Sequence, residues 1–330
     1  MHYIRVVISL FLLAVSLVVT ASQSYTAVSY NCENLFDTKH DSLKNDAEFT
    51  PNGARQWSFS RYWKKVNDIG RVIVQIGGKG EEWSLPDIVG LVEVENDSVM
   101  HMLTRKSLLK GASYNYVITE SDDIRGLDVA LMYNALKFKL LDKENIRISK
   151  IRDYRSTRDI LHVTLRSVRM DTLHVFVVHS PSRRGGQYNA EEQRKMVIEN
   201  ILNRIKLLNT GNNCKNNIIV MGDFNDYSYS KPLRDIANAG LKEVTEGVRG
   251  LYHTDDVAGT YYFKQEWGSL DHIFTSENVF AEKCYIYDAD WLLEKTNSGA
   301  LKPRRTYLGE YYKGGVSDHL PLVLKFSIGN

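Results

Sequence analysis

The stretch Ile-Ile-Val-Met-Gly-Asp-Phe-Asn-Asp (218–226) joins a short apolar run to acidic and amide residues. Its apolar part, ending at Gly222, has the length and composition of a buried β-strand. Asp223 and Asn225 follow at the point where a loop should begin. This change from an apolar strand to a polar end recurs along the chain and separates it from an ordinary α/β domain.

Other short, β-rich apolar runs are spread over the whole sequence. Because these runs alternate with a few helical segments, we expect layered α/β packing. Besides Ile218–Gly222, the predicted strands are Thr26–Asn31, Ile88–Val94, Tyr114–Thr119, Asp128–Tyr133, Leu161–Arg166, Leu173–His179, Ser269–Thr275 and Leu320–Phe326.

Two segments have helical periodicity. Ser60–Ile76 places apolar residues three and four positions apart and stops at Gly77. Ala190–Leu208 repeats this spacing, begins with acidic residues and ends before Gly211. Both segments are therefore predicted to be amphipathic helices.

Composition and charge indicate one folded domain over 24–330. The 330 residues are 43% hydrophobic, include 6 prolines, and contain no linker tract or internal repeat. A net charge of +2 is too small to require a polyanionic partner. The chain has three cysteines, Cys32, Cys214 and Cys284. They have neither the density of a disulfide framework nor the spacing of a zinc site, and the sequence does not decide whether two of them form one disulfide bridge.

The first 23 residues resemble a cleaved signal peptide. Arg5 precedes the apolar run Val6–Val19, and Ala21 follows in a small-residue cleavage region. The run is shorter than the roughly 20 residues that a stable transmembrane helix needs. We therefore expect export to the periplasm or release from the cell, with an uncleaved membrane anchor as the alternative.

Six predicted strands carry acidic, amide or histidine residues at one end. Each residue alone could simply make a turn or pack in the core. Carboxylates that converge on one sheet edge would repel one another without a cation, and a hard divalent ion with oxygen ligands is the usual partner. Histidines add proton-transfer groups near neutral pH. The residues are Asn31, Glu33, Glu93, Glu95, His179, Asp223, Asn225, Asp271, Asp318 and His319.

In their order along the chain, these motifs resemble the endonuclease/exonuclease/phosphatase superfamily, which includes deoxyribonucleases, abasic-site repair endonucleases, inositol-phosphate phosphatases and neutral sphingomyelinases. The resemblance covers nearly the whole chain after the apolar N-terminus. The motifs are Tyr-Asn-Cys-Glu-Asn-Leu-Phe-Asp (30–37), Gly-Leu-Val-Glu-Val-Glu-Asn (90–96), Arg-Gly-Leu-Asp-Val-Ala-Leu (125–131), Gly-Asp-Phe-Asn-Asp (222–226), Leu-Asp-His-Ile-Phe (270–274) and Ser-Asp-His-Leu-Pro-Leu (317–322).

The resemblance implies a four-layer α/β/β/α sandwich of two facing mixed β-sheets with outer helices and an active site at one end. It also implies a Mg²⁺ or Mn²⁺ ion with Glu93 as its principal ligand and Glu95 as the competing candidate. Asn31, Asp318 and Glu33 are further metal-ligand candidates, and Asn31 is also a candidate substrate contact.

The catalytic roles are carried over in the same way. Asp223 and Asn225 match the residues that orient or deprotonate the attacking water, and we expect them on one face of an extended segment. His319 matches the catalytic histidine and Asp271 its carboxylate partner. Whether Asp223 or His319 takes the proton stays open. His179 is a candidate donor to the leaving oxygen or the phosphate.

Substrate contacts are predicted from side-chain chemistry. Arg125 and Arg183 could donate bidentate hydrogen bonds to phosphate, with solvated arginine as the alternative. Trp267 lies in an aromatic cluster that includes Tyr261 and Phe263, and the cluster could stack on a base or a sugar or belong to the core.

Together these features predict an exported metal-dependent phosphodiesterase that acts as a nuclease on nucleic acid. His179 stands where the repair branch carries tyrosine, which argues against a repair enzyme. A sphingomyelinase or phospholipase C-like enzyme and a small-molecule phosphoesterase are the alternatives, and a non-catalytic binding module is a third. We expect a monomer without a stable protein partner.

Overall fold

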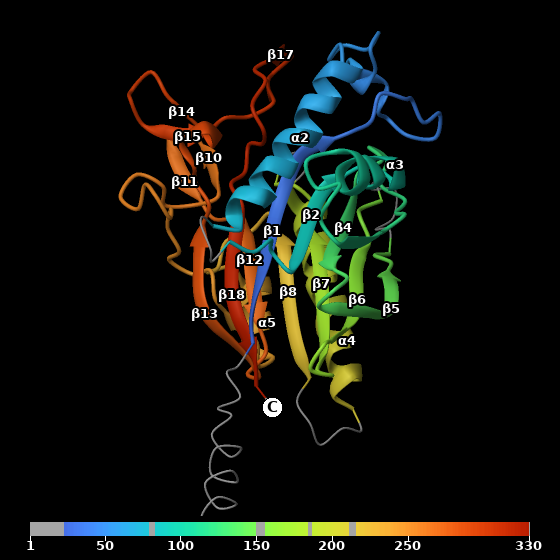
Figure 1. Ribbon diagram of the computed structural model, residues 1–330, viewed down its shortest axis with the longest axis vertical. Coiled ribbons are helices and arrows are strands. Elements are labelled where there is room, and N and C mark those ends of the chain that lie inside the picture. Colours follow the sequence, from blue (N-terminus) through green and yellow to red (C-terminus); the bar gives the residue numbers. More distant parts are fainter. Residues whose placement is uncertain (1–22, 79–82, 150–155, 184–186, 211–215, 330) are drawn as a thin grey trace, which may run out of the picture.

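Two six-stranded β-sheets form the centre of the computed structural model, which describes residues 23–78, 83–149, 156–183, 187–210 and 216–329 (Figure 1). The first sheet has the order β13-β18-β1-β2-β4-β3, with β13 (Val279–Ile286), β18 (Leu322–Ile328), β1 (Ser24–Leu35), β2 (Ile88–Val94), β4 (Asp128–Asn134) and β3 (Tyr114–Ile118). The second has the order β5-β6-β7-β8-β12-β9, with β5 (Phe138–Ile146), β6 (Ile160–Ser167), β7 (Thr172–His179), β8 (Asn217–Asp223), β12 (Asp271–Thr275) and β9 (Lys242–Glu243).

Each sheet is mixed because it contains one parallel pair, β1–β2 or β7–β8, among antiparallel neighbours. The carboxyl ends of a parallel pair lie at the same edge, and an antiparallel neighbour begins there. For this reason His179 and Asp223 are register partners, and Asp271 at the start of β12 lies opposite Asp223.

The main core lies between the two sheets. Along β7, Val175 and Val177 belong to the core that includes the first sheet, whereas Phe176 and Val178 belong to the core beneath the α4 helix. This alternation is the period of two that a strand imposes on its side chains. The sheets approach so closely at Gly90 that an added Cβ would lie 2.8 Å from the Met221 methyl carbon.

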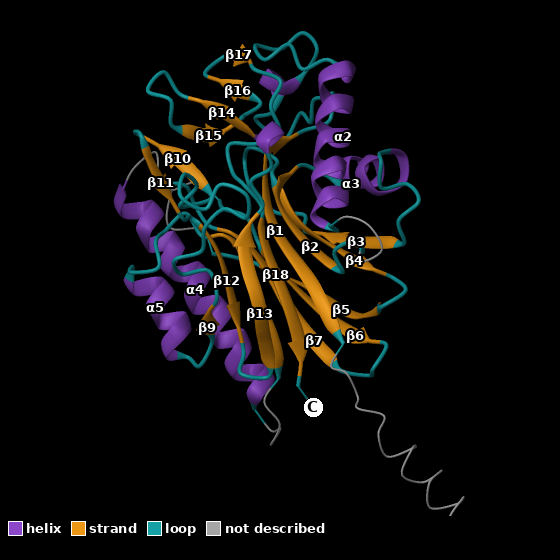
Figure 2. Cartoon of the chain, turned by 60° about the vertical axis from the view of Figure 1, so that its left-hand side comes forward, coloured by secondary structure: helices purple, strands orange, loops and turns teal. Residues whose placement is uncertain are grey.

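Helices cover both outer faces, which completes the predicted four layers (Figure 2). The α2 helix begins after Ser58, whose hydroxyl caps it by accepting from Arg61 N, and it buries Val66, Ile69 and Ile73 toward the first sheet. The helices are α2 (Phe59–Ile76), α3 (Asp97–His101), α4 (Gln187–Asn209) and α5 (Lys231–Asn238), with single-turn segments at Ala47–Phe49, Met102–Lys106 and Asp290–Leu292.

The predicted fold class, the strands and the two long helices are therefore confirmed. Strands β5 and β13 were not predicted because both are sheet edges and their exposed positions carry charged residues, so their hydrophobic alternation is weak. Three short hairpins also extend from the end of the sandwich where the site residues lie: β10–β11 (Tyr261–Phe263 and Glu266–Gly268), β14–β15 (Leu293–Lys295 and Leu301–Pro303) and β16–β17 (Tyr307–Leu308 and Tyr311–Tyr312).

Two predictions concern residues that the structure does not describe. Residues 1–22 of the predicted signal peptide and Cys214 lie outside the described ranges. Cys32 and Cys284 are free thiols. In the described part of the chain, no helix combines the length and the apolar character needed to span a membrane.

A buried histidine pair lies on the face of the second sheet that α4 covers. The Nε2 atom of His162 lies 3.1 Å from Nδ1 of His174, and Glu144, itself paired with Arg204, accepts from the other side of His162. Burial lowers the pKa of both rings from 6.5, and burial together with the neighbouring His162 lowers the pKa of His174 to about 4.

This histidine pair should make stability depend on pH. In the unfolded chain His174 takes up a proton below pH 6.5, whereas in the folded protein it stays neutral until about pH 4. The contribution of neutral His174 to folding stability is therefore complete above pH 6.5 and is lost as the pH falls toward 4. The loss from His174 should reach about 3 kcal/mol. Thermal unfolding between pH 7.5 and pH 4.5 should therefore show a smaller drop in Tm for His174→Gln than for the wild type, and equal drops would contradict this.

Candidate active site

The backbone departs from regular strand geometry where β1 and β2 reach the site. Glu33, Asn34 and Glu93 have φ values of +48°, +58° and +61°, and the β1–β2 and β2–β4 registers shift at these positions. Such left-handed bulges turn a side chain away from the direction that the strand would give it. They bring Glu93 into the cavity described below, whereas Glu95 accepts a hydrogen bond from Asp37 N at 2.6 Å.

Glu93 is an ionised carboxylate surrounded by cations. Its Oε2 accepts from Asn34 N at 2.8 Å, and its Oε1 lies 3.7 Å from Nε2 of His179 and 3.9 Å from Nη1 of Arg125. Burial opposes ionisation, but Arg125, Arg158 and His319 outweigh it and hold the pKa of Glu93 below its usual value.

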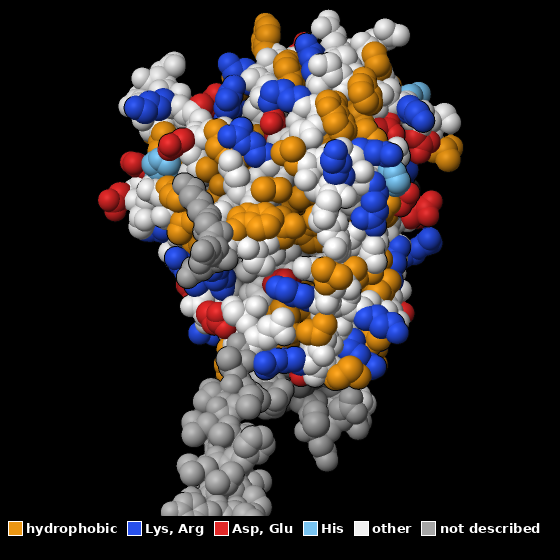
Figure 3. Space-filling view, in the orientation of Figure 1, with side chains coloured by type: hydrophobic (Ala, Val, Ile, Leu, Met, Phe, Trp, Pro, Cys, Tyr) orange, Lys and Arg blue, Asp and Glu red, His pale blue; other side chains and the backbone are white. Residues whose placement is uncertain are grey.

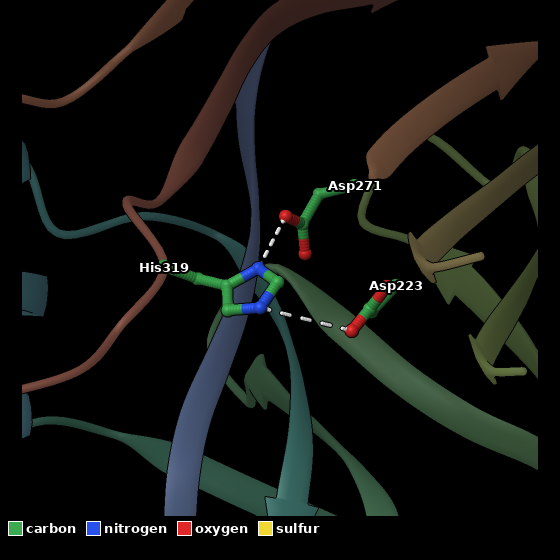
Figure 4. Close-up of side chains that lie close together, drawn as sticks. All are labelled: Asp223, Asp271 and His319. Atoms are coloured by element: carbon green, nitrogen blue, oxygen red, sulfur yellow. Dashed lines mark hydrogen bonds and ion pairs between the residues drawn. The ribbon is translucent and has the colours of Figure 1, made fainter. Parts of the chain in front are cut away.

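His319 and Asp271 form a buried dyad (Figure 4). Nδ1 of His319 lies 2.7 Å from Oδ2 of Asp271, which also accepts from the Thr260 hydroxyl at 2.5 Å. The ring of Tyr261 packs 4.8 Å from the imidazole. Burial lowers the pKa of His319, but the Asp271 carboxylate outweighs it and raises that pKa well above 6.5, so the imidazolium is favoured at neutral pH.

Asp223 lies across from Nε2 of His319, with 4.0 Å between the imidazole nitrogen and Oδ2 (Figure 4). The same oxygen accepts from Nδ2 of Asn31 at 3.1 Å and lies 3.9 Å from Nε2 of His179. Burial first, and then the negative charge of Asp271, raise the pKa of Asp223 to about 7. A carboxylate in this state can exchange a proton near neutral pH.

The expectation that Asp223 and Asn225 share a face of an extended segment is wrong. Asn225 has φ +50°, and its N–H donates to Oδ1 of Asp223 at 2.8 Å in a tight turn. The turn still brings Asn225 to the cavity, where its Nδ2 donates to the Ser180 carbonyl at 3.0 Å. Gly222 precedes the turn with φ +143°, and an added Cβ would lie 1.9 Å from the Val178 carbonyl oxygen.

His179 is buried at the end of β7 and is neutral. Burial, Arg158 and Arg125 lower its pKa well below 6.5. Its Nδ1 has no hydrogen-bond partner within the described part of the protein, whereas Nε2 faces the Glu93 and Asp223 carboxylates. These contacts favour the tautomer with the proton on Nε2, which points a neutral donor into the site.

His272 is not part of this group. On the opposite face of β12, its ring contacts Oε1 of Glu243 at 2.8 Å and the Asp226 carbonyl at 2.9 Å, and it is fully buried. These contacts agree with the structural role that its position next to Asp271 implies.

The catalytic candidates His179, Asp223, Asn225 and His319 line one cavity of about 770 Å³, whereas Asp271 is buried and does not line it. Arg125 and Arg183, the predicted phosphate contacts, line it, as do Arg158 and Arg305, which were not among the candidates from the sequence. Arg158 pairs with Asp123 at 3.3 Å. The cavity-lining residues include Asn31, Glu33, Asn34, Phe49, Glu93, His179, Asp223, Asn225, Tyr227, Tyr261, Phe263, Leu270, Tyr307, Asp318 and His319.

Trp267 does not line the cavity, contrary to its predicted role as a substrate contact. Trp267 lies opposite Tyr262 in the β10–β11 hairpin, and their rings pack 5.2 Å apart against the core. Tyr261 and Phe263 lie on the face of β10 opposite to Tyr262, and they reach the cavity instead. The prediction chose the right hairpin and the wrong face, because a three-residue strand has too short a pattern to show which side is buried.

The predicted metal ligands fall into two groups. Glu93 presents Oε1 to the cavity, and Asn31 lies beside Asp223. Glu33 and Asp318 are already engaged, because Glu33 accepts from Thr306 N at 2.6 Å and Asp318 accepts from Arg305 at 2.6 Å. Carboxylate and amide oxygens suit a hard divalent ion, so the Glu93 side of the cavity fits Mg²⁺ or Mn²⁺ better than the Glu33 side.

A second group of potential ligand atoms belongs to Asp223, Asp271 and His319, which lie within 4.8 Å of one another. Two of these atoms are already committed to each other in the 2.7 Å contact between His319 and Asp271. We therefore interpret this group as proton-transfer machinery, and Glu93 as the anchor for a metal ion.

The chain is similar to known proteins in sequence and in fold. Residues 26–327 match the model described as the Endonuclease/Exonuclease/phosphatase family. A Bacteroides thetaiotaomicron protein of that family has a similar structure at TM-score 0.60 and 18% identity, covering 93% of this chain and 98% of its own. A mannosyl-6-phosphatase from the same organism gives TM-score 0.60 and 16% identity, covering 92% and 100%.

D. rerio TDP2 in complex with a single-strand DNA product has TM-score 0.57 and 17% identity, covering 92% of this chain and 99% of that one. No curated protein matches the chain. At these identities the likeness to solved structures shows the fold.

Replacing Asp271 with asparagine should lower the pKa of His319, because it removes the carboxylate that holds the proton on the ring. NMR titration of the His319 ring protons should show a charged ring at neutral pH in the wild type and a neutral ring in Asp271→Asn. Asp290→Asn is the matched control, since that carboxylate is 93% exposed and contacts only His253 in the described structure. An unchanged His319 titration in Asp271→Asn would rule out the dyad.

Proposed function

Because the chain belongs to the endonuclease/exonuclease/phosphatase family, whose model it matches over residues 26–327, we propose that it is a divalent-metal-dependent phosphodiesterase that hydrolyses nucleic acid. The observation that carries this proposal is the meeting of Glu93, Asp223 and His319 in one cavity, with buried Asp271 bonded to His319. Members of the family are phosphoester hydrolases. The choice of nucleic acid as the substrate is the part of this proposal that goes beyond membership of the family.

Glu93 would hold the metal ion, with the Asn31 amide beside it, whereas Asp318 is already paired with Arg305. When bound, Mg²⁺ or Mn²⁺ supplies positive charge that neutralises the phosphate and stabilises the leaving oxygen. The ionised state of Glu93 in the folded protein supports this role, because a metal ligand must be deprotonated.

Asp223 is the better candidate for the base that takes the proton from water. Its pKa near 7 allows it to be ionised and still basic at neutral pH. His319 carries a proton already, because Asp271 raises its pKa, and is therefore suited to donate a hydrogen bond to a phosphate oxygen. Asn31 holds the Asp223 carboxylate in place through the 3.1 Å hydrogen bond.

His179 would act as a neutral donor on the same phosphate. Its Nε2 lies between Glu93 and Asp223, at 3.7 and 3.9 Å from their oxygens. A donor at this position can stabilise charge on the leaving oxygen without adding a second imidazolium to the site. Because the pKa of His179 is lowered well below 6.5, this donor stays neutral across the physiological range.

The cavity wall supports a nucleic-acid substrate held by local contacts. Arg125, Arg158 and Arg183 can donate to phosphate oxygens, while Tyr261 and Phe263 offer aromatic faces to a base or a sugar. On the surface in Figure 3, Lys and Arg side chains are interspersed with acidic and apolar ones instead of forming one broad basic face. We therefore favour a flexible single strand or chain end that can enter the cavity.

A small phosphoester, such as a sugar phosphate, is the second candidate. A cavity of about 770 Å³ could enclose much of such a molecule, and the structurally similar mannosyl-6-phosphatase carries that activity in its name. A phospholipid head group would need the same chemistry. We further propose that the protein acts as an exported monomer, following the signal-like N-terminus in the sequence.

The protein from Ser24 onward should cleave plasmid DNA or single-stranded DNA when Mg²⁺ or Mn²⁺ is added. Glu93→Ala and His319→Ala should each reduce the rate by at least about 100-fold, because each removes charge stabilisation at the reacting phosphate. RNA, sphingomyelin, mannose 6-phosphate and a chromogenic diester complete the substrate panel. Turnover of one of these alone would replace the nucleic-acid assignment, whereas binding without turnover would indicate a non-catalytic module.

The pH dependence of kcat/KM should identify the base. If Asp223 accepts the proton, activity must rise with pH through about 7, because only its ionised form is competent. Asp223→Asn should remove this rise and reduce the rate by about 10² to 10⁴-fold. A wild-type profile that is flat from pH 6 to 8 would assign the base elsewhere.

A further inference from the structure

Arg305 occupies the side of the cavity away from the Glu93–Arg125 pair. Its Nη2 donates to Oδ2 of Asp318 at 2.6 Å, and its Nε lies 3.5 Å from Oε1 of Glu33. The side chain is 28% exposed and lines the cavity. Among the described residues, no protein group accepts from its Nη1.

The segment that carries Arg305 is fixed to β1. Oε2 of Glu33 accepts from Thr306 N at 2.6 Å, and Oε1 accepts from Tyr307 N at 3.4 Å. The Nζ atom of buried Lys65 donates both to the Glu33 carbonyl, at 2.7 Å, and to the Thr306 hydroxyl, at 2.5 Å. These contacts hold the backbone of the segment, and thus the start of the Arg305 side chain, in one place.

Lys65 also contacts the loop that leads to His319. Its Nζ donates to the Val316 carbonyl at 3.0 Å, and Val316 N in turn donates to the Arg304 carbonyl at 2.8 Å. Residues on both sides of the β16–β17 hairpin are therefore bound to each other and to Lys65. A buried amine with three oxygen acceptors is well satisfied, so removing it would leave those acceptors unpaired.

The contacts of Glu33 and Asp318 contrast with those of Glu93. In the described part of the chain, Glu93 Oε1 has longer contacts, at 3.7 Å to His179 and 3.9 Å to Arg125. A cation that used Glu33 and Asp318 would first have to displace a guanidinium and two backbone donors. Breaking charge-assisted hydrogen bonds in a buried site is costly, so a divalent ion should bind on the Glu93 side.

We propose that Arg305 is a fixed cation of the active site, which takes the place of a metal ion between Glu33 and Asp318 and binds a substrate phosphate oxygen through Nη1. Glu33 is then a positioning residue that holds Arg305. The phosphate contact rests on the proposed function, whereas the exclusion of metal from Glu33 and Asp318 rests on the contacts of Arg305 and Lys65 alone.

The first experiment titrates Mn²⁺ into the protein by calorimetry and by electron paramagnetic resonance. The wild type should bind one ion, Glu93→Gln should lose it, and Glu33→Gln should keep it. Arg305→Met should acquire a second, weaker site, because it leaves two neighbouring carboxylates without their cation. Arg305→Lys should keep the stoichiometry at one. Arg304→Met removes an exposed charge next to Arg305 and should behave as the wild type.

The second experiment titrates inorganic phosphate without metal. Arg305→Met should weaken phosphate binding by about tenfold, since a charge-assisted hydrogen bond is lost. Arg305→Lys should give an intermediate affinity, because a point charge replaces a planar donor. Arg304→Met should leave the affinity unchanged. If circular dichroism shows that Arg305→Met does not fold, the phosphate affinities of Arg305→Lys and Glu33→Gln are compared with that of the wild type instead.

Two wild-type Mn²⁺ ions, one of them lost in Glu33→Gln, would overturn the fixed-cation role. Equal phosphate affinity in the wild type and the folded Arg305 variants would overturn the phosphate contact. Neither readout requires turnover. The proposed function could therefore fail, with no phosphoester hydrolysed by the wild type, while the ion count and the phosphate affinity still decide the role of Arg305.

Discussion

The face-to-face packing of the two β-sheets is the constraint on which the site depends. Val177 and Met221 of one sheet lie so close to Gly90 of the other that an added Cβ at Gly90 would be 2.8 Å from the Met221 methyl carbon. This contact sets β1 and β2 against β7 and β8, so the ends of two parallel pairs open into one cavity. Glu93 comes from the first sheet and His179 and Asp223 from the second, which means that neither sheet contains a complete site.

Burial in that shared cavity gives chemically similar residues different protonation states. His319 is held charged by Asp271, whereas His179 is held neutral by burial first and then by Arg158 and Arg125. Burial first, and then Asp271, push Asp223 toward neutrality, while Glu93 is kept ionised by Arg125 and Arg158. The site therefore contains, within a few ångströms, a fixed anion, a titrating carboxylate, a neutral donor and a charged donor, which are the groups that the proposed mechanism uses.

Cations of the protein itself share the neutralisation of this acidic cavity. Arg305 and Lys65 accompany Glu33 and Asp318, and Arg125 accompanies Glu93 at a longer distance. The difference in distance distinguishes a carboxylate that is already paired from one that can still take a metal ion. The walls of the cavity carry further arginines and the rings of Tyr227, Tyr261 and Phe263.

The sequence by itself determined the fold class, most strands of the two sheets and the residue types of the site, because strand periodicity and the polar residues at strand ends are local properties of the chain. Only the tertiary structure decided which way those side chains point. Left-handed backbone at Glu33, Glu93 and Asn225 redirects them, and pairing across the β10–β11 hairpin turns Trp267 away from the cavity. Arg305 and Arg158 also emerged only there, because an arginine acquires its role from the carboxylates that distant segments place beside it, and linear spacing does not contain that information.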